Sequence, residues 1–204
     1  IEEDSMAIVV EHDKRKHEIL EKALEVFIEE GYEDVTFQKI AERCGITRTT
    51  LYIYFKNKRE IFLWSIKQLT YGIEQELNEI VANENQTSEE CLRAMLSTIV
   101  DVCEENKSLF SVLLTYLLSL QKSGDEPGKR VRRRVVRLQH MLSTVMIRGI
   151  KEGEFKKVNV KSANEMFYGL IQSAIFRLSV LDEKTIDDIR DTLNQAVDGI
   201  LTEK

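Results

Sequence analysis

Residues that interrupt helices are scarce in this sequence, whose 204 residues include one proline and nine glycines. Between these few breaks, apolar residues recur at the three- and four-residue spacing of an amphipathic helix, and no pair of alternating strands flanks a hairpin turn. The apolar fraction of 43% is large enough to build a packed core. We therefore predict a globular, all-α protein with about nine helices.

The helix boundaries follow from caps and breakers. Thr36 and Thr47 are favourable N-cap residues, while Gly31 and Gly45 can end the helices that precede them. The segment "SLFSVLLTYLLSL" is apolar nearly all round, which predicts burial on every side. We expect helices at about residues 13–30, 37–44, 47–55, 57–82, 88–105, 108–120, 129–152, 161–181 and 184–201.

Several classes of protein are disfavoured by what the sequence contains. Cys44, Cys91 and Cys103 lack metal-ligand spacing, and the last two would lie about 18 Å apart on one helix. No apolar run reaches the roughly 18 residues of a membrane span, and no secretory signal pattern opens the chain. We expect buried thiols in a reducing cytoplasm, with no membrane partner and no cofactor or metal.

A short basic stretch stands out in an acidic chain. Residues 36–59 contain six basic side chains and one acidic one, although the net charge of the whole chain is −6. A basic module on an acidic body is typical of a protein that neutralises the phosphates of a polyanion. The alternative is a basic face that is merely solvated.

Spacing within this stretch favours DNA. Two short helices separated by the Gly45 turn are a helix-turn-helix, whose second helix can enter the major groove. Arg48 lies near the start of that helix and can reach guanine O6 and N7, while Thr49 and Thr50 suit a thymine methyl group or a phosphate. These residues predict readout of base edges.

Other side chains of the stretch suit the phosphate backbone. Tyr52 and Tyr54 can donate phenol hydroxyls to phosphate oxygens, and Thr36 and Thr47 place hydroxyls at helix N-termini. Lys58 would add a cation to the first turn of the next helix, where backbone N–H groups and the helix dipole also attract phosphate.

The order "VTFQKIAERCGITRTTLYIYFKNKREIF", residues 35–62, resembles the DNA-binding signature of the TetR family of bacterial transcriptional regulators. The preceding "FIEEGYEDVTF" and the later "GIKEGEF" fit the same pattern. Tyr54 stands where many relatives have histidine. The resemblance implies that the following residues face DNA: Thr36, Gln38, Arg48, Thr49, Thr50, Tyr52, Tyr54 and Lys58.

The resemblance also implies an architecture and a mode of action. A three-helix DNA-binding domain, residues 12–57, would precede a helical domain for ligand binding and dimerisation, residues 58–204. Such a homodimer typically represses transcription from a palindromic operator until a small apolar or amphipathic effector releases it. The alternative keeps DNA binding but has no effector, as in an architectural or partner-controlled protein. We find no catalytic motif and expect no enzyme activity.

The last two predicted helices carry a hydrophobic seam. On the final helix, apolar residues repeat by sevens, and the preceding helix carries a matching stripe. This pattern predicts a four-helix bundle made by two chains, although both helices could instead close the core of one chain. The predicted interface residues are Phe167, Leu170, Ala174, Leu178, Ile186, Ile189, Leu193, Ala196 and Ile200.

The predicted effector pocket is lined by apolar residues of the larger domain, any of which could instead belong to the core. A basic run, Lys129 to Arg137, could attract an anionic effector, approach DNA, or form a solvated face. The candidate lining residues are Trp64, Met95, Ile99, Phe110, Leu113, Leu117, Met141, Val145, Phe167 and Ile171.

Overall fold

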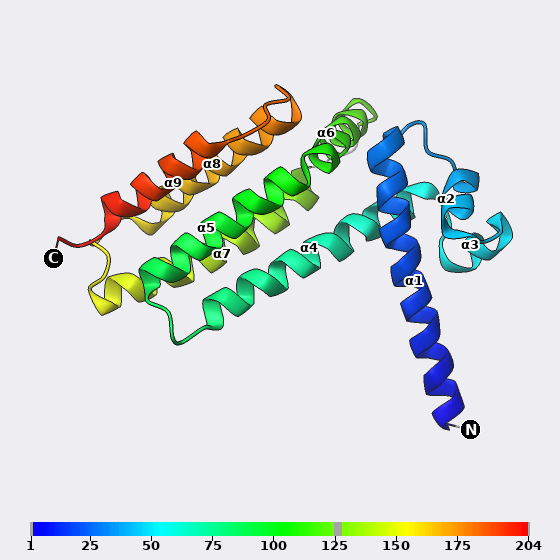
Figure 1. Ribbon diagram of the computed structural model, residues 1–204, viewed down its shortest axis with the longest axis horizontal. Coiled ribbons are helices and arrows are strands. Elements are labelled where there is room, and N and C mark those ends of the chain that lie inside the picture. The colour runs from blue at the N-terminus through cyan, green and yellow to red at the C-terminus, as the bar shows by residue number, and fades with distance from the viewer. Residues whose placement is uncertain (1, 125–127, 204) are drawn as a thin grey trace. The chain divides into compact units, whose positions relative to one another are not determined.

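The computed structural model describes residues 2–124 and 128–203, and the side chains of residues 11–124 and 131–203. These residues form nine helices and, apart from one isolated bridge between Phe155 and Leu201, no β-structure, which confirms the all-α prediction (Figure 1). The helices are α1 (Glu2–Glu30), α2 (Phe37–Cys44), α3 (Arg48–Tyr54), α4 (Lys58–Ala82), α5 (Ser88–Glu105), α6 (Lys107–Lys122), α7 (Gly128–Glu152), α8 (Val160–Ser179) and α9 (Asp187–Ile200).

The first helix is longer than predicted. We expected α1 to begin near Asp13, but it begins at Glu2, because no glycine or proline stands between these positions to stop it. Its end agrees with the prediction. Gly31 adopts a left-handed backbone with φ of 80°, and its N–H donates to the Phe27 carbonyl at 3.0 Å.

The chain divides into two compact units between Gly72 and Ile73, inside α4. We call residues 2–72 the head and residues 73–203 the body. The domains proposed from the sequence meet earlier, at residues 57 and 58, and that functional boundary stays a prediction. Helix α4 therefore contributes to both units.

The core of the head is built around α1. The buried Phe27 ring meets the Phe62 ring of α4 edge-on, with centroids 4.9 Å apart. The buried Ser65 hydroxyl donates to the Leu20 carbonyl at 2.9 Å, which fastens α4 to α1. Helix α2 packs on α1 as well, through Ile40 and its neighbours. This core leaves one side of α3 free of packing.

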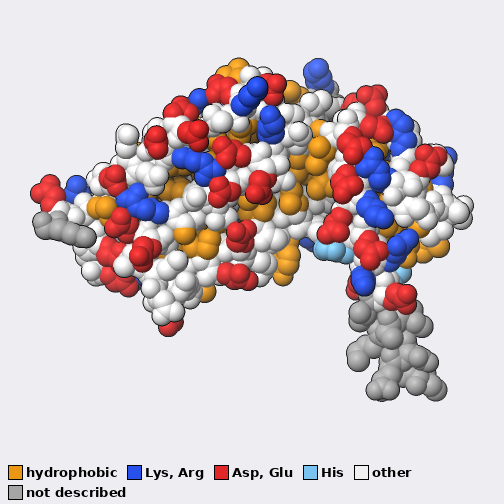
Figure 2. All heavy atoms as spheres, in the orientation of Figure 1, with side chains coloured by type: hydrophobic (Ala, Val, Ile, Leu, Met, Phe, Trp, Pro, Cys, Tyr) orange, Lys and Arg blue, Asp and Glu red, His pale blue; other side chains and the backbone are white. Residues whose placement is uncertain are grey.

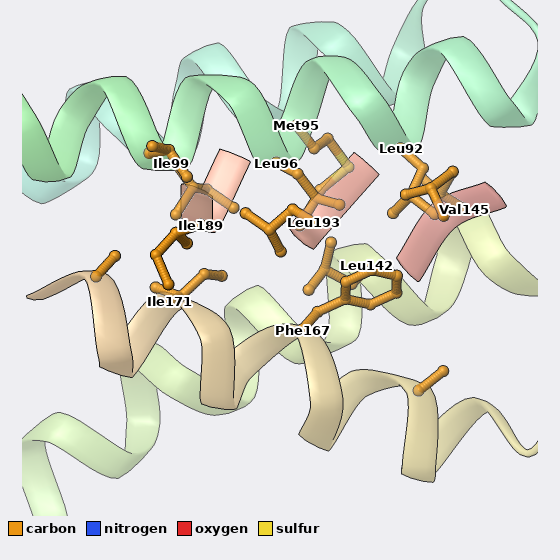
Figure 3. Packing of buried hydrophobic residues seen from close by; sticks show 14 of the residues in the cluster. Leu92, Met95, Leu96, Ile99, Leu142, Val145, Phe167, Ile171, Ile189 and Leu193 are labelled. Carbon is orange, nitrogen blue, oxygen red and sulfur yellow. The ribbon is translucent and has the colours of Figure 1, made fainter. Parts of the chain in front are cut away.

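The core of the body lies between α5, α7, α8 and α9, whose apolar stripes interdigitate in Figure 3. Leu92 and Met95 of α5 meet Leu142 of α7 and Phe167 of α8 there, and all four are fully buried. Burial of these stripes is the main force that holds the body together. The three cysteines are also buried, as predicted, and burial raises the pKa of Cys103 to about 12.

One prediction about the body is wrong, and a second is not tested. The first concerns α6, which we expected to be buried on every side. Only Leu109 and Tyr116 of this helix are buried, whereas Leu118 is 58% exposed. The reason is that α6 packs on α8 and α5, and the described residues leave its opposite apolar side largely uncovered.

The second concerns the seam on α8 and α9, whose role as a dimer interface stays a prediction. Most residues of the repeat pack inside one chain, against α5, α7 and each other. Leu170 and Ala196 alone are half-buried. The predicted interface residues that the single chain buries are Phe167, Ala174, Leu178, Ile186, Ile189, Leu193 and Ile200.

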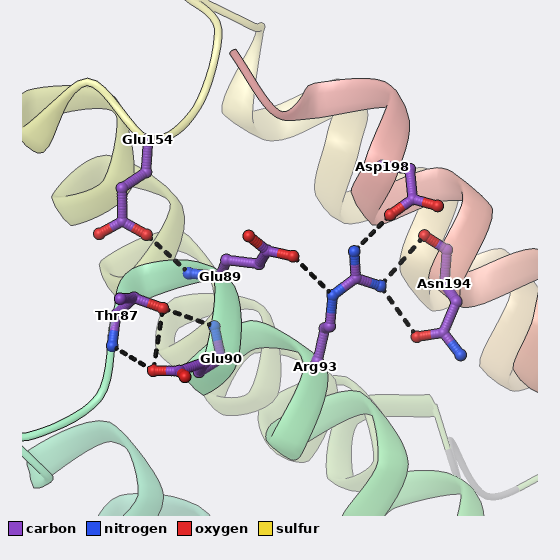
Figure 4. A network of polar contacts seen from close by, with 7 residues as sticks. All are labelled: Thr87, Glu89, Glu90, Arg93, Glu154, Asn194 and Asp198. Carbon is purple, nitrogen blue, oxygen red and sulfur yellow. Dashed lines mark hydrogen bonds and ion pairs between the residues drawn. The ribbon is translucent and has the colours of Figure 1, made fainter. Parts of the chain in front are cut away.

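The N-terminus of α5 carries two sets of caps (Figure 4). Thr87 and Glu90 form a capping box, in which the Glu90 N–H donates to the Thr87 hydroxyl at 3.1 Å. The Glu154 carboxylate accepts the N–H groups of Ser88 and Glu89, both at 3.0 Å. Four orphan donors of one helix end are thereby largely satisfied.

This arrangement gives a role to the segment "GIKEGEF", residues 149–155, which covers the last turn of α7 and the three residues after it. A Cβ added at Gly149 would lie 2.3 Å from the Phe155 ring, so only glycine lets that ring close on the helix. Phe155 then directs the preceding residue, Glu154, toward α5. Farther along α5, Arg93 links Glu89 to Asp198 of α9 (Figure 4).

Among the described residues, the helices are too short or too polar for any of them to cross a membrane.

Candidate nucleic-acid interface

The local geometry of α2 and α3 is set by their caps. The Thr36 hydroxyl accepts the Lys39 N–H at 3.3 Å, and the Thr47 hydroxyl accepts the Thr50 N–H at 3.0 Å. Between the helices, Gly45 has φ of 65°, a conformation that suits glycine and reverses the chain tightly. The predicted caps and turn are confirmed.

Helix α3 has a buried side and an exposed side. Leu51 and Phe55 are buried, as the sequence predicted. The residues predicted to touch DNA lie elsewhere on the surface, and all of them retain exposure to solvent. Thr36, Gln38, Thr47, Arg48, Thr49 and Tyr52 are exposed, whereas Thr50, Tyr54 and Lys58 are half-buried.

Arg48 and Tyr52 form a preorganised pair on the exposed side. The Arg48 guanidinium donates to the Tyr52 hydroxyl at 3.2 Å and lies 5.6 Å from the centre of its ring. The Tyr52 ring in turn stacks on Phe37 of α2, with centroids 4.5 Å apart. A guanidinium has five N–H donors, so this contact leaves Arg48 able to bind a base edge in the fork geometry that guanine requires.

Two other predicted contacts are partly occupied within the chain. The Gln38 amide nitrogen donates to the Glu42 carboxylate at 2.8 Å, and the hydroxyls of Thr47 and Thr50 lie 2.8 Å apart. Gln38 keeps its carbonyl oxygen and a second N–H for a ligand. The Thr47 hydroxyl mainly serves the helix cap.

Lys58 makes contacts within the head that the sequence did not predict. Its ammonium group donates to the carbonyls of Tyr32, Glu33 and Val35, at 2.8, 2.9 and 3.1 Å, and stands over the Tyr32 ring. An ammonium has three N–H donors, and all three are used. In this conformation Lys58 fixes the turn between α1 and α2, and its contact with a phosphate stays a prediction.

The basic charge of the stretch is also partly neutralised. Lys39 pairs with Glu30 of α1, and Arg43 pairs with Glu29 and Glu25 of the same helix. The hydrogen bond with Glu30 raises the pKa of Lys39, and the hydrogen bond with Arg43 lowers the pKa of Glu29. Figure 2 shows acidic and basic side chains interspersed over α1.

Sequence reasoning missed these pairings because the acids lie outside the basic stretch. Glu25 and Glu29 share a face of α1 at a spacing of four residues, and Glu30 follows directly, an acidic cluster that could have signalled partners for the basic residues of α2. Arg48 and Lys56 are exposed to solvent and remain the main candidates for binding an anion.

The predicted effector residues are only partly brought together. Met95, Ile99, Val145, Phe167 and Ile171 lie in the packed core of the body (Figure 3). Their tight packing supports the alternative role that the sequence left open. Three further candidates, Phe110, Leu113 and Leu117, are half-buried on α6.

Trp64 and Met141 lie in other surroundings. Trp64 belongs to the head, where the ammonium groups of Lys16 and Lys67 lie 4.8 and 4.2 Å from its ring centre. Met141 is half-buried on α7 and lines a hollow in the body, described next.

The hollow lies between the C-terminal half of α4 and α7 and has a volume of about 400 Å³. Arg137 spans it, donating to the Glu74 carboxylate at 3.0 Å. One turn earlier, burial lowers the pKa of the Arg134 guanidinium. The side chains of Lys129 and Arg130, which the sequence grouped with this basic run, lie outside the described residues. The lining residues are Glu74, Asn78, Val136, Arg137, His140 and Met141.

The hollow combines the Arg137–Glu74 ion pair with apolar contacts from Val136 and Met141. A second hollow of about 410 Å³ lies along the end of α7 and is lined by Thr144, Ile147, Arg148, Lys151 and Glu152. Within the described residues, no group of three or more His, Cys, Asp or Glu side chains could hold a metal ion.

Comparison with known proteins places these features in context. Residues 19–63 match the family model described as "Bacterial regulatory proteins, tetR family". Over 168 residues the chain is 27% identical to the fatty acid metabolism regulator protein of Bacillus subtilis (strain 168), an alignment that covers 82% of this chain and 84% of that protein.

Solved structures share the fold. A TetR transcription regulator from Haloarcula marismortui superposes with a TM-score of 0.81 at 23% identity, covering 93% of this chain and 100% of that one. The regulator FadR from Bacillus subtilis, in complex with stearoyl-CoA, superposes with a TM-score of 0.70 at 24% identity, covering 91% and 97% of the two chains.

Proposed function

We propose that this chain, a member of the tetR family of bacterial regulatory proteins, is a transcriptional repressor that binds an inverted-repeat operator as a homodimer and leaves it when an amphipathic effector binds the body. The observation that carries the proposal is the exposed side of α3, where Arg48 is held by Tyr52 above a buried core. A helix presented in this way can enter the major groove.

The exposed side chains suggest which residues contact bases and which contact phosphates. Arg48 is assigned to a guanine edge, with Thr49 and Gln38 beside it, since these side chains are exposed and retain donors or acceptors. Tyr52 and Tyr54 are assigned to phosphates. Lys56, exposed just after α3, is assigned a phosphate contact that does not depend on base sequence, in place of Lys58.

A homodimer is proposed through a different face of α8 from the one that the sequence indicated. The apolar residues on the exposed side are Met166 and Phe176 of α8 and Val180 just after it, which are 41–53% exposed. Gly169 and Ser173 lie along the same side, where small residues permit close approach. Exposed apolar side chains on one side of a helix are typical of an interface.

The effector is proposed to occupy the hollow between α4 and α7. Its Arg137 rim attracts an anion, while Val136 and Met141 offer apolar contacts. The resemblance to a fatty acid metabolism regulator suggests a long-chain acyl thioester of coenzyme A as the ligand class. Because α4 continues from the hollow into the head, a ligand that separates Glu74 from Arg137 acts directly on the helix that follows α3.

The proposal is tested by selecting bound fragments of the organism's genomic DNA with the purified protein. We expect enrichment of an inverted repeat whose half-sites are one or more helical turns apart, each turn about 34–36 Å. Stearoyl-CoA should then release the selected DNA, and Arg137→Ala should weaken that release. Salt-sensitive binding without an enriched sequence would instead favour an architectural protein, and an inverted repeat insensitive to acyl thioesters would refute the effector class alone.

A further inference from the structure

One residue of α1 that precedes the segment matching the family, His12, lies beside the end of α3. That match begins at residue 19, whereas α1 begins at Glu2. The His12 imidazole stacks on the phenol ring of Tyr54, with ring centroids 4.7 Å apart and planes inclined by 22°. A residue seven positions before the matched segment therefore touches a side chain assigned to DNA.

Helical spacing explains why His12 lies there. His12, Lys16 and Ile19 follow one another at four and three residues, so they occupy one face of α1. Ile19 is buried in the head, and the Lys16 ammonium lies 5.5 Å from the ring centre of Phe55. This face is thus held against the end of α3 over two turns, and His12 is positioned by contacts within the head.

We propose that His12 is a further DNA-binding residue, which donates to a backbone phosphate beside the one contacted by Tyr54 and makes DNA binding depend on pH. The inference rests on the proposed function, because it takes the exposed side of α3 as the side that meets DNA. Once protonated, an imidazole has a donor at each ring nitrogen and carries a positive charge. Histidine is the side chain that ordinarily changes charge between pH 5 and 8.

The surroundings of His12 leave it open to a phosphate. Its side chain is 48% exposed; among the described residues it contacts Asp13 and Tyr54, and Lys16 lies one turn farther along α1. The Asp13 carboxylate lies 3.9 Å from Nδ1 but is itself 75% exposed, so solvent screens it. Stacking on Tyr54 positions the partly exposed ring, and a charge-assisted bond to an anionic oxygen is stronger than a neutral one.

His17 provides a matched control on the same helix. It is 59% exposed, and its Nε2 lies 3.4 Å from the Glu21 carboxylate. Five residues separate it from His12, which turns it to a different face of α1 at about 100° per residue. Replacing either histidine by glutamine removes one titratable group from α1 and keeps a polar side chain.

The experiment measures the affinity of the full chain for a short duplex of random sequence at low salt, at about pH 6 and about pH 8. A random duplex is suitable because a phosphate contact carries no sequence information. For the wild type we expect binding to be about fivefold tighter at the lower pH, together with a steeper dependence on salt. His12→Gln should remove most of both effects, and His17→Gln should leave both in place.

The possible failures are distinguishable. If His12→Gln keeps the pH effect and the steeper salt dependence of the wild type, the inference is overturned. Equal losses from both glutamine variants would overturn it as well, because they would indicate a general charge effect of α1. If the wild type binds no duplex at all, the proposed function itself fails. Thermal unfolding of each variant, expected to match the wild type, excludes loss of fold as the cause.

Discussion

The head and the body differ in where their most informative side chains lie. In the head, residues predicted to bind a partner, such as Arg48 and Tyr52, lie on the outside of a small core. In the body, residues predicted to meet a partner, such as Leu193 and Ala174, lie inside. A hydrophobic repeat shows that a stripe is buried, but whether it is buried against the same chain or another depends on contacts distant in sequence.

The largest expected effect is a loss of stability on substitution of a core residue of the body. Leu193→Glu should unfold the body, because a carboxylate placed in the core has no partner, at a cost of about 3–5 kcal/mol or more. Chemical denaturation followed by circular dichroism measures the change. Gln195→Glu, at an exposed position of the same helix, should leave stability nearly unchanged. A folded Leu193→Glu monomer would restore the original interface assignment.

A second substitution tests the exposed face of α8. Phe176→Glu should give a folded monomer, because the new charge faces solvent in one chain and another chain in the proposed dimer. Operator affinity should fall at least about tenfold, since each half-site then binds separately. Light scattering reports the mass. Lys161→Glu, near the start of α8, is the control, and a dimer that survives Phe176→Glu places the interface elsewhere.

Substitution of two lysines separates a structural role in the head from a role in DNA binding. Lys58→Ala should destabilise the head by about 1–3 kcal/mol, because three carbonyls lose their donor. Lys56→Ala should leave stability unchanged and flatten the salt dependence of DNA binding by about one per subunit. Thermal unfolding and binding titrations separate the two effects. The reverse pattern would return the phosphate contact to Lys58.

The smallest expected effect concerns the cap of α5. Burial raises the pKa of Glu154, but hydrogen bonds from the N–H groups of Ser88 and Glu89 outweigh it, so the pKa lies below its ordinary 4.5. Its stabilising contribution is present above pH 4.5 and is lost as the pH falls through the lower value in the folded protein.

Glu154→Gln should therefore cost about 0.5–1.5 kcal/mol at neutral pH and progressively less in acid. Denaturation at several pH values checks this. A cost that stays constant into acid would show that the carboxylate charge contributes nothing to the cap.

Local features were predictable from the sequence, and distant ones were not. Caps at Thr36 and Thr47 and the turn at Gly45 depend on neighbouring residues, and the structure has all three. The roles of Lys58 and Arg43 depend on carbonyls and carboxylates of or near α1, which spacing within the basic stretch does not reveal. The hollow between α4 and α7 likewise needs two helices that are far apart in sequence.

The most direct test of sequence readout compares wild type and Arg48→Ala on the selected operator and on a scrambled duplex of equal length. If Arg48 binds a base edge, its removal should weaken operator binding by about 1–3 kcal/mol and change binding to the scrambled duplex far less. Selection with the variant should also relax the preference at one position of each half-site. An equal loss on both duplexes would contradict the central claim, because Arg48 would then contact only the phosphate backbone.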